Sequence, residues 1–509
     1  MTDRQFSVFT GLALAGALLS LVLLAARFAS AISISEPLQL QTSGDEFSSH
    51  FAIWRHIQGL PVYTDRFSPP FSFSIYNWLF YDSYGRLTAA VLGVLSLGEP
   101  WIPTIGRLIS LAAMVVGMVA AHLAFVRAAA AMNQKSQLLC LAFAVLVMAG
   151  PLVGFWNVTV RSDLWARTFE AVAVAAFLAE YPRRRWAAVL WAVPFAYFAW
   201  AFKQGNVFAA GAIGLFLLVR RDWKSLAMLA ILLPALWGAT LFFGEPQYVY
   251  NVLLRDVPYL GGAGHMFRNL VNFGVKTGPM LFLLAGVLVV VLVDRKRRAA
   301  LWRRDAFVLG VAGSLCAAVL TLPASSYRGG AENYYFTLSF FMALAAVASL
   351  PVMLATNDTA RSRVLTAGSA GWATLIVAIG LVLAGTVGVV DVRPQHVANM
   401  QKKRCLDGLP RPLFVDSPLL SLPWMTPGNE PWVISYVYED DRRAGHAFKE
   451  GGVGGLIAKG RFNVMALQKS GRGSPAAFDG ASLSDYRLVD DAEAARRGCP
   501  DFYLFFKKS

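Results

Sequence analysis

Polar residues gather at a few places between the long apolar stretches of this chain. They are Gly44-Asp45-Glu46, Arg161-Ser162-Asp163, Lys203-Gln204 and the run 325–335, which contains Arg328, Glu332, Asn333 and Tyr334. Carboxylates and separated cations that meet at one depth of a membrane would form a pocket for an anionic lipid head group and a hydroxyl-bearing acceptor. The candidate substrate-binding residues in this set are Asp163, Gln204, Glu332, Asn333 and Tyr334.

The chemistry that suits such a pocket is transfer of a sugar from a polyprenyl-phosphate donor to a hydroxyl group. Phosphate is a good leaving group that needs charge stabilisation, for which Lys203, Arg161 and Arg328 are the candidates. The acceptor hydroxyl is a poor nucleophile until its proton is removed. Asp45 is the candidate general base, and Glu46 beside it is the second candidate catalytic carboxylate. Attack opposite the phosphate would invert the anomeric carbon, as in the base half of an inverting glycosidase.

Each of these residues also has a structural interpretation that the sequence leaves open. Asp45 would cap a following helix, because Asp is favoured at that position. On that helix Glu46 would point about 100° away from Asp45, into the pocket or solvent. Arg161 and Asp163 would simply pair at a helix entrance, and Lys203 would only extend its ammonium group to the lipid head groups.

A divalent metal is compatible with the sequence, but no convincing ligand set is present and no other cofactor is indicated. Glu46 and His50 stand one helical turn apart and would suit either a shared ion or solvation at the membrane interface. Gly-rich phosphate loops, zinc patterns and Ser-His-Asp arrangements are absent from the sequence. The four cysteines are too few for a disulfide framework.

The elements that must position these residues are membrane helices. The 509-residue chain is 56% hydrophobic and only 15% charged, whereas a soluble domain has about 25% charged residues. Apolar runs of about 20 residues span a bilayer, and about eleven such segments are present. The first is too long for a typical signal peptide and is expected to be retained. The expected spans are 6–32, 101–124, 136–156, 164–180, 187–202, 206–219, 225–243, 277–293, 306–323, 334–354 and 366–390.

The net charge of +15 reflects membrane topology and not a nucleic-acid partner, because the basic residues cluster in alternate short loops. These loops, near 127–135, 183–185, 220–224, 295–304 and 361–363, should face the cytoplasm. A multi-pass protein of the bacterial inner membrane with a cytoplasmic N-terminus is therefore expected. An odd number of spans places the C-terminus in the periplasm.

The segment 187–219 lies between two basic clusters and needs separate treatment. As one helix it would be about 50 Å long, too long for a hydrocarbon core near 30 Å. A single crossing would also place one of the clusters outside. Two short helices joined at Lys203-Gln204-Gly205-Asn206 satisfy both constraints and place the Lys203 ammonium group at the level of the outer head groups.

Two segments are expected outside the membrane. In the juxtamembrane loop 33–98, apolar residues at helical spacing predict an amphipathic helix in the plane of the interface. The chain is therefore divided into a transmembrane domain, 1–392, and a small periplasmic α/β domain, 393–509. Strands are expected at 413–415, 432–438, 462–467 and 502–506, and a helix at 442–450. Cys405 and Cys499 in this domain would form a disulfide or remain two buried thiols.

The order of the polar motifs resembles the GT-C superfamily of membrane glycosyltransferases, near the protein O-mannosyltransferase and lipid A aminoarabinose transferase branch. The matching segments are Gly44-Asp45-Glu46, Gln58-Gly59-Leu60-Pro61-Val62-Tyr63, Arg161-Ser162-Asp163, Lys203-Gln204 and Gly329-Gly330-Ala331-Glu332-Asn333-Tyr334. The resemblance covers roughly 1–390. It implies a polytopic α-helical fold, a lipid-linked donor, Asp45 as the base and Tyr63 among the substrate-binding residues.

The sequence leaves the acceptor open among glycans, lipids and proteins, and it does not identify the sugar. A transporter or flippase of lipid-linked saccharides is the alternative function. Transporters of that kind usually contain repeated halves and broken helices near the midplane. No such repeat is visible here, and the ionisable residues lie near one surface. A polymerase or ligase of lipid-linked glycans is a third interpretation, disfavoured by the early acidic loop.

Overall fold

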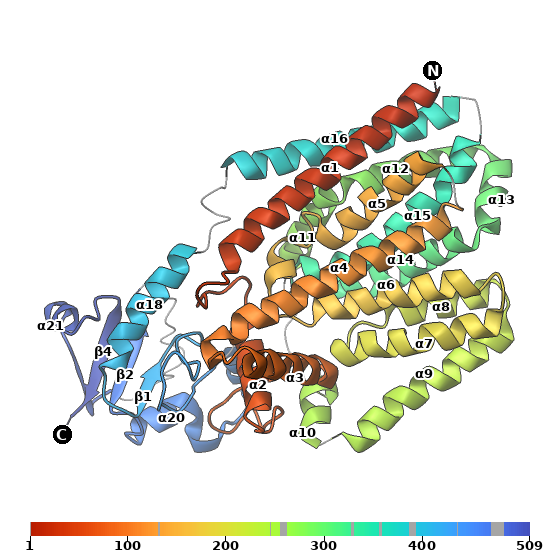
Figure 1. Ribbon diagram of the computed structural model, residues 1–509. Coiled ribbons are helices and arrows are strands. Elements are labelled where there is room, and N and C mark those ends of the chain that lie inside the picture. The colour runs from red at the N-terminus through yellow and green to blue at the C-terminus, as the bar shows by residue number, and fades with distance from the viewer. Residues whose placement is uncertain are drawn as a thin grey trace.

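The structure, a computed structural model, describes residues 2–130, 133–244, 246–254, 262–326, 330–355, 359–385, 393–434, 436–469 and 483–508. A bundle of long helices occupies most of the molecule, and a small domain that contains the sheet lies beyond one end of it (Figure 1). The N-terminus and α13 (Arg295–Arg303) lie at the opposite end of the bundle from the C-terminus (Figure 1).

Each of the eleven expected spans contains a helix, although residues 386–390 of the last expected span lie outside the described residues. These helices are α1 (Thr2–Ala31), α4 (Ile102–Ala128), α5 (Gln134–Ala149), α6 (Asp163–Glu180), α7 (Arg185–Phe202), α8 (Phe208–Val219), α9 (Trp223–Phe243), α12 (Gly278–Val293), α14 (Asp305–Ala324), α15 (Phe336–Leu354) and α16 (Thr359–Gly385). Among the described residues, six helices are long and apolar enough to cross a membrane. The bent pair α11 (Ala263–Lys276) and α12 would be a seventh. The chain is a multi-pass membrane protein.

Small residues let the bundle helices approach closely, as is usual where lipid offers no hydrophobic drive for association. On α14, a Cβ added to Gly310 would lie 2.6 Å from the backbone nitrogen of Ala345 on α15. On α16, a Cβ on Gly371 would lie 2.7 Å from the carbonyl oxygen of Gly278 at the start of α12. These two positions therefore fix helix–helix contacts that a larger residue would separate.

The segment between the two basic clusters forms the expected pair of short helices. α7 has 18 residues and α8 has 12, and the chain turns between them at 203–206. Lys203 ends α7 with extended backbone, so the helix cannot continue through it. The charge pattern and the length limit of the bilayer together predicted this break correctly.

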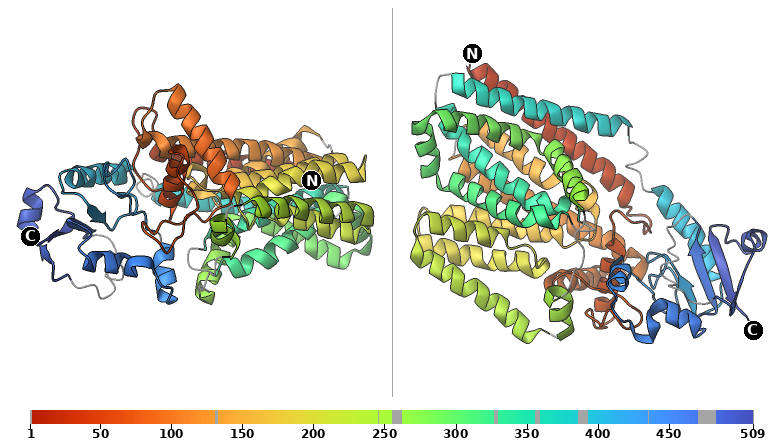
Figure 2. Two further views of the ribbon diagram at one scale, coloured as in Figure 1. Left: turned by 90° about the horizontal axis from the view of Figure 1, so that it is seen from below. Right: turned by 180° about the vertical axis from the view of Figure 1, so that it is seen from behind.

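The loop 33–98 contains α2 (Glu46–Ile57) and α3 (Trp78–Val94), followed by the short η1 (Glu99–Trp101). Both helices lie at the end of the bundle that meets the C-terminal domain (Figure 2). Phe51 and Ile53 of α2 are buried in a cluster that also includes Phe80 of α3 and Leu504 of the C-terminal domain. The helix is as predicted, but much of its apolar face packs against protein instead of lying in the membrane interface.

The C-terminal domain has a four-stranded sheet in the order β1-β2-β4-β3, with β1 and β2 parallel and the other pairs antiparallel. Its strands are β1 (Leu413–Val415), β2 (Val464–Gln468), β3 (Tyr486–Leu488) and β4 (Phe502–Lys507). Its helices are α18 (Arg393–Asp407), α19 (Tyr436–Arg443), α20 (Gly452–Ala458) and α21 (Asp491–Arg496), with η5 (Lys449–Gly451) before α20. Three of the four expected strands are confirmed, and β3 was missed.

Two expectations for this domain were wrong. The described part of 432–438 forms no strand, because Trp432 and Tyr438 pack with Phe71 and Phe462 in an aromatic core instead of a ladder. The helix expected over 442–450 is absent, because α19 ends at Arg443 and the chain then turns. Phe71 comes from the loop 33–98, so this loop completes the core of the C-terminal domain.

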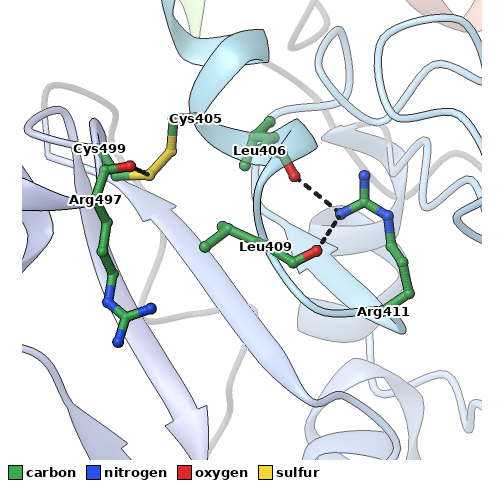
Figure 3. The surroundings of a disulfide bond; sticks show 6 residues. All are labelled: Cys405, Leu406, Leu409, Arg411, Arg497 and Cys499. Carbon is green, nitrogen blue, oxygen red and sulfur yellow. Dashed lines mark hydrogen bonds between the residues drawn. A yellow bond between two sulfur atoms is a disulfide. The ribbon is translucent and has the colours of Figure 1, made fainter.

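Cys405 and Cys499 form a disulfide between residues 94 apart in sequence, which joins the end of α18 to the segment before β4 (Figure 3). This decides between the two interpretations that the sequence left open. Arg411 lies beside this region and donates to the carbonyl oxygens of Leu406 and Leu409 at 3.0 and 3.2 Å (Figure 3). The disulfide therefore holds α18 against the sheet. Cys140 and Cys316 are free thiols.

We expect two of the four cysteines to resist alkylation in SDS until a reductant is added, because an oxidising compartment keeps this pair oxidised. The measurement is the gel shift of the unfolded protein with a maleimide polymer, before and after reduction. Cys316→Ser should lose one label before reduction, whereas Cys405→Ser should expose Cys499 and gain one. Labelling of all four thiols without reductant would contradict the disulfide.

Candidate active site

The centre of the site is a buried ion pair between Glu46, the first residue of α2, and Arg107 on α4. Arg107 Nε and Nη2 each lie 3.0 Å from one oxygen of the Glu46 carboxylate. Both side chains are fully buried. A two-bond fork of this kind fixes orientation as well as distance, because guanidinium and carboxylate are both planar.

The same two side chains hold several backbone segments together. Glu46 accepts hydrogen bonds from the backbone N–H groups of Thr42 at 2.9 Å and Val160 at 3.1 Å. Arg107 donates to the carbonyl oxygens of Ala31, at the end of α1, and Leu40. Because Glu46 is bonded to Val160, their chain neighbours Asp45 and Arg161 are brought to the same place.

Glu46 was a candidate catalytic carboxylate, with a pocket or solvent position as the alternative. The Glu46 side chain points neither into a pocket nor into solvent. Both of its carboxylate oxygens accept hydrogen bonds from Arg107 and from backbone N–H groups. Burial alone would raise the pKa of Glu46, but Arg107 and then His50 lower it to about 2. We therefore assign Glu46 to positioning Asp45 and not to proton transfer.

Asp45 stands at the N-terminus of α2 in the left-handed region of backbone conformation, with φ of 64°. Its side chain makes no capping hydrogen bond to the helix, so the interpretation as a helix cap was wrong. Instead, Oδ1 accepts a hydrogen bond from Ser48 Oγ at 2.8 Å, and the carboxylate is 6% exposed. The contact with Ser48 helps to hold the carboxylate in place.

Arg161 has the carboxylates of Asp45 and Asp163 as its acidic neighbours. Burial alone would lower the pKa of its guanidinium, but Tyr76, Asp45 and Asp163 around it raise it, so the charge is retained. Arg161 donates to the Tyr76 hydroxyl, and its guanidinium lies 5.0 Å from the centre of the Trp156 ring. Burial raises the pKa of Tyr76 well above its ordinary value despite Arg161, so the phenol keeps its proton.

Three elements meet at Asp163, the first residue of α6. Lys203, from the turn between α7 and α8, forms an ion pair with Asp163 Oδ1. Asn333, in η4 (Glu332–Tyr335), donates to the same oxygen at 2.8 Å. The Lys203 ammonium nitrogen is also 5.0 Å from the centre of the Tyr334 ring. Lys203 is therefore a bound member of this cluster and does not merely extend to the lipid head groups.

Glu170 was not singled out from the sequence, although an acidic residue inside an apolar span is a signal of function or of a buried partner. It is fully buried on α6, two turns after Asp163. It accepts from the backbone N–H of Phe208 at the start of α8 and from Thr337 Oγ1 on α15. Asp163 and Glu170 together hold the α7–α8 turn and the η4–α15 segment against α6.

The remaining predicted residues are arranged around this cluster. Gln204 Nε2 donates to the carbonyl oxygen of Ile75, and the Tyr63 hydroxyl donates to that of Tyr76. Both side chains therefore support the segment that carries Tyr76. Glu332 pairs with Lys276 of α11. Arg328 lies outside the described residues, as do its neighbours 327 and 329.

Two carboxylates of this region are already paired with cations. Glu46 is paired with Arg107, and Asp163 with Lys203. Within the described ranges, no three His, Cys, Asp or Glu residues come together as metal ligands usually do. His50 Nε2 lies 3.6 Å from Glu46 Oε1, so the two side chains contact each other directly. No step of the chemistry is therefore assigned to a metal.

The sequence matches no protein-family model and no curated protein. The structure is similar to ArnT from Cupriavidus metallidurans in the apo state, with a TM-score of 0.55, 13% identity, and 96% of this chain and 97% of that chain covered. ArnT bound to undecaprenyl phosphate gives a TM-score of 0.51, 12% identity and the same coverage.

The apo oligosaccharyltransferase of Archaeoglobus fulgidus gives a TM-score of 0.47 and 14% identity. That match covers 78% of this chain and 57% of the archaeal chain, so the protein spans little more than half the length of that enzyme. The two ArnT matches carry the comparison. They include the C-terminal domain as well as the helices, because they cover nearly the whole chain. They show a fold like that of ArnT over nearly the whole chain.

We expect Glu46→Ala to lower the stability by about 3–5 kcal/mol, because it leaves the fully buried Arg107 without a counter-charge. The measurement is the midpoint of thermal unfolding in detergent. Glu36→Ala, in the same loop and 62% exposed, is the control and should change little. Replacing both partners by leucine should recover part of the loss. A midpoint for Glu46→Ala equal to that of the control would contradict the role of the pair.

The stability should also fall as the pH drops from about 6.5 towards 4. Burial lowers the pKa of His50 to about 4, against the raising effect of Glu46 and together with Arg107. Below pH 6.5 the unfolded chain therefore binds the proton more readily than the folded protein, which favours unfolding. The unfolding midpoint of His50→Gln should depend less on pH in this window. His446→Gln is the control, and identical pH profiles for wild type and His50→Gln would contradict the account.

Proposed function

We propose that this protein is a membrane glycosyltransferase that moves one sugar from a polyprenyl-phosphate donor to a hydroxyl group outside the cytoplasm. The observation that carries the proposal is the convergence of Asp45, Arg161, Asp163 and Lys203, which lie before α2, at the entrance to α6 and in the α7–α8 turn. These residues come from three separate segments of the chain. Their convergence assembles two carboxylates and two cations, a set that suits a lipid head group and a soluble acceptor.

The likeness to ArnT supports the class of donor. One of the two ArnT structures is bound to undecaprenyl phosphate. This protein has a helical bundle of the same fold. Cations at the end where the bundle meets the soluble domain suit a lipid phosphate. The polyprenyl chain remains in the membrane while the charged head is desolvated only among groups that compensate it.

In the proposed reaction Asp45 takes the proton of the acceptor hydroxyl. The oxygen of that hydroxyl then forms a bond to the anomeric carbon while the bond from this carbon to the phosphate oxygen breaks. The electron pair leaves with the polyprenyl phosphate, whose added charge Arg161 and Lys203 stabilise. Attack opposite the phosphate inverts the anomeric carbon. Arg328 is proposed as a third phosphate ligand on the basis of its place in the sequence.

The proposed orientation has a cytoplasmic N-terminus and a periplasmic C-terminal domain in a bacterial inner membrane. The basic helix α13 lies at the end of the bundle away from that domain, as the positive-inside rule requires (Figure 1). The disulfide in the C-terminal domain supports an oxidising compartment. The acceptor is proposed to be a glycan, lipid or protein that reaches the site from this side.

We expect Asp45→Asn to reduce sugar transfer by about 10²–10⁴-fold, because the amide keeps the shape of the carboxylate but cannot accept the proton. The measurement is transfer of a radiolabelled sugar from glycosylated undecaprenyl phosphate to acceptors in membranes that contain the protein. Asp82→Asn, on the neighbouring α3, is the matched control and should retain activity.

Undiminished transfer by a correctly folded Asp45→Asn protein would overturn the assignment of the base. Movement of the labelled lipid across the membrane without formation of a new glycosidic bond would instead favour a transporter or flippase.

A further inference from the structure

The helix α11 precedes the span α12, at the end of α12 away from α13 (Figure 1). The two helices are bent by 83° relative to each other. α12 has 16 residues and is about 24 Å long, so it crosses most of a hydrocarbon core near 30 Å without α11. Transmembrane helices are tilted by about 20° on average. A helix at nearly a right angle to α12 therefore runs along the surface of the membrane.

One face of α11 packs against the segment that leads into η4. His265 Nε2 donates to the carbonyl oxygen of Gly330 at 2.6 Å, and Asn269 Nδ2 donates to the same oxygen at 3.3 Å. The ring of Phe273 stacks on that of Tyr335 with 4.9 Å between their centres. Asn269 and Phe273 are buried, so this face of α11 is fully used by the protein.

The same face connects α11 to the candidate active site. Lys276, in the last turn of α11, forms an ion pair with Glu332 of η4. The next residue of η4, Asn333, donates to Asp163 Oδ1 at 2.8 Å. The position of Asn333 beside Asp163 therefore depends on where α11 is held.

The opposite face of α11 is apolar and exposed. It consists of Phe267, Leu270, Val271 and Val275, which are 66%, 40%, 45% and 49% exposed. Their spacing of three and four residues places them on one side of the helix, away from Asn269 and Phe273. We call these four residues the apolar face of α11.

The depth at which α11 lies follows from the residues around this face. In the hydrocarbon core the exposed guanidinium of Arg268 would meet lipid chains, which charged side chains avoid. In water the apolar face would form an uncovered patch of the kind that marks an interaction site. At the level of the head groups the apolar face reaches lipid chains and Arg268 reaches phosphate groups. α11 contains Arg268 and Lys276 but no acidic residue, which complements those phosphates.

The exposed surface of α12 adjoins α11 and supports the same partner. A Cβ added to Gly274, near the end of α11, would lie 4.0 Å from Leu281 Cδ1 of α12. Phe282 and Val289 of α12 are 43% and 51% exposed on a span of the membrane domain. The lipid-facing surface of α12 therefore begins directly beside α11.

We propose that α11 docks on the phospholipid head-group layer through its apolar face, and that this lipid contact holds the η4 segment in position. The partner is the membrane surface, with its hydrocarbon boundary against Phe267 and Val271 and its phosphates against Arg268. The relevance of η4 to sugar transfer rests on the proposed function, whereas the lipid contact does not.

The first test measures the depth of the apolar face in phospholipid nanodiscs. The full-length protein carries Cys140→Ser and Cys316→Ser, because the other two cysteines form the disulfide. A nitroxide is attached at Phe267→Cys or Val271→Cys, and its relaxation by oxygen is compared with that by a water-soluble nickel chelate. Oxygen is enriched in lipid, so it should relax both labels more strongly than the chelate does.

Two equally exposed positions calibrate this measurement. Val289→Cys on α12 is the lipid-facing reference, and Leu488→Cys on β3, 53% exposed, is the water-facing one. Val275→Cys replaces a variant on α11 that does not fold. Labels on α11 that respond to the chelate as strongly as Leu488→Cys would overturn the proposal. Weak relaxation by both reagents, which indicates that protein covers the face, would overturn it as well.

The second test asks whether the lipid contact holds η4. Phe267→Asp places a charge on the apolar face, and Leu488→Asp is the matched control on the C-terminal domain. In nanodiscs the peptide 330–335 should exchange its amide hydrogens at least about threefold faster in Phe267→Asp than in the wild type, and unchanged in the control.

Equal exchange of this peptide in Phe267→Asp and the control would overturn the link between the membrane surface and η4. Both tests use the intact protein in a membrane and neither measures sugar transfer. Failure of sugar transfer by the wild type would therefore overturn the proposed function alone, and a water-exposed α11 would overturn this inference alone.

Discussion

The arrangement of the whole site depends on the buried pair of Glu46 and Arg107. A fully buried arginine is tolerated only if its charge and its donors are satisfied, and this one is satisfied by Glu46 and two backbone carbonyl groups. Because the partner carboxylate also holds the backbone of Val160, the loop 33–98 and the entrance to α6 have one relative position. Asp45 and Arg161 are the chain neighbours of these two residues, so their proximity follows from the pair and needs no contact of their own.

The same principle operates one layer deeper. Asp163 and Glu170 project from one helix two turns apart, and each collects partners from the α7–α8 turn and from the η4–α15 region. Buried carboxylates thus serve as the points where segments distant in sequence are joined. The C-terminal domain belongs to this construction, because Arg66 of the first loop forms a buried ion pair with Asp441 and Phe71 enters its aromatic core. The C-terminal domain is thus attached firmly to the loop that carries Asp45.

The sequence predicted the elements and the groups that converge, but not the roles within the cluster. The α7–α8 break followed from hydrophobic length and charge, and Asp45, Arg161 and Lys203 followed from the polar positions and the order of the motifs. The role of Glu46 could not be predicted, because its partner Arg107 lies 61 residues away inside an apolar run and no local spacing connects them. Glu170 was missed, although a lone acid in an apolar span is a signal of function or of a buried partner. The strand prediction for 432–438 was wrong, because an aromatic run can pack in the core as part of a loop as well as in a β-sheet.

The most direct measurement is an experimental structure of the full-length protein with undecaprenyl phosphate bound. The account predicts the phosphate within hydrogen-bond reach, about 3 Å, of Arg161 or Lys203, with the Asp45 carboxylate facing the position that the anomeric carbon would occupy. A phosphate bound at the end of the bundle near α13, or an Asp45 side chain separated from Arg161 by intervening protein, would contradict it.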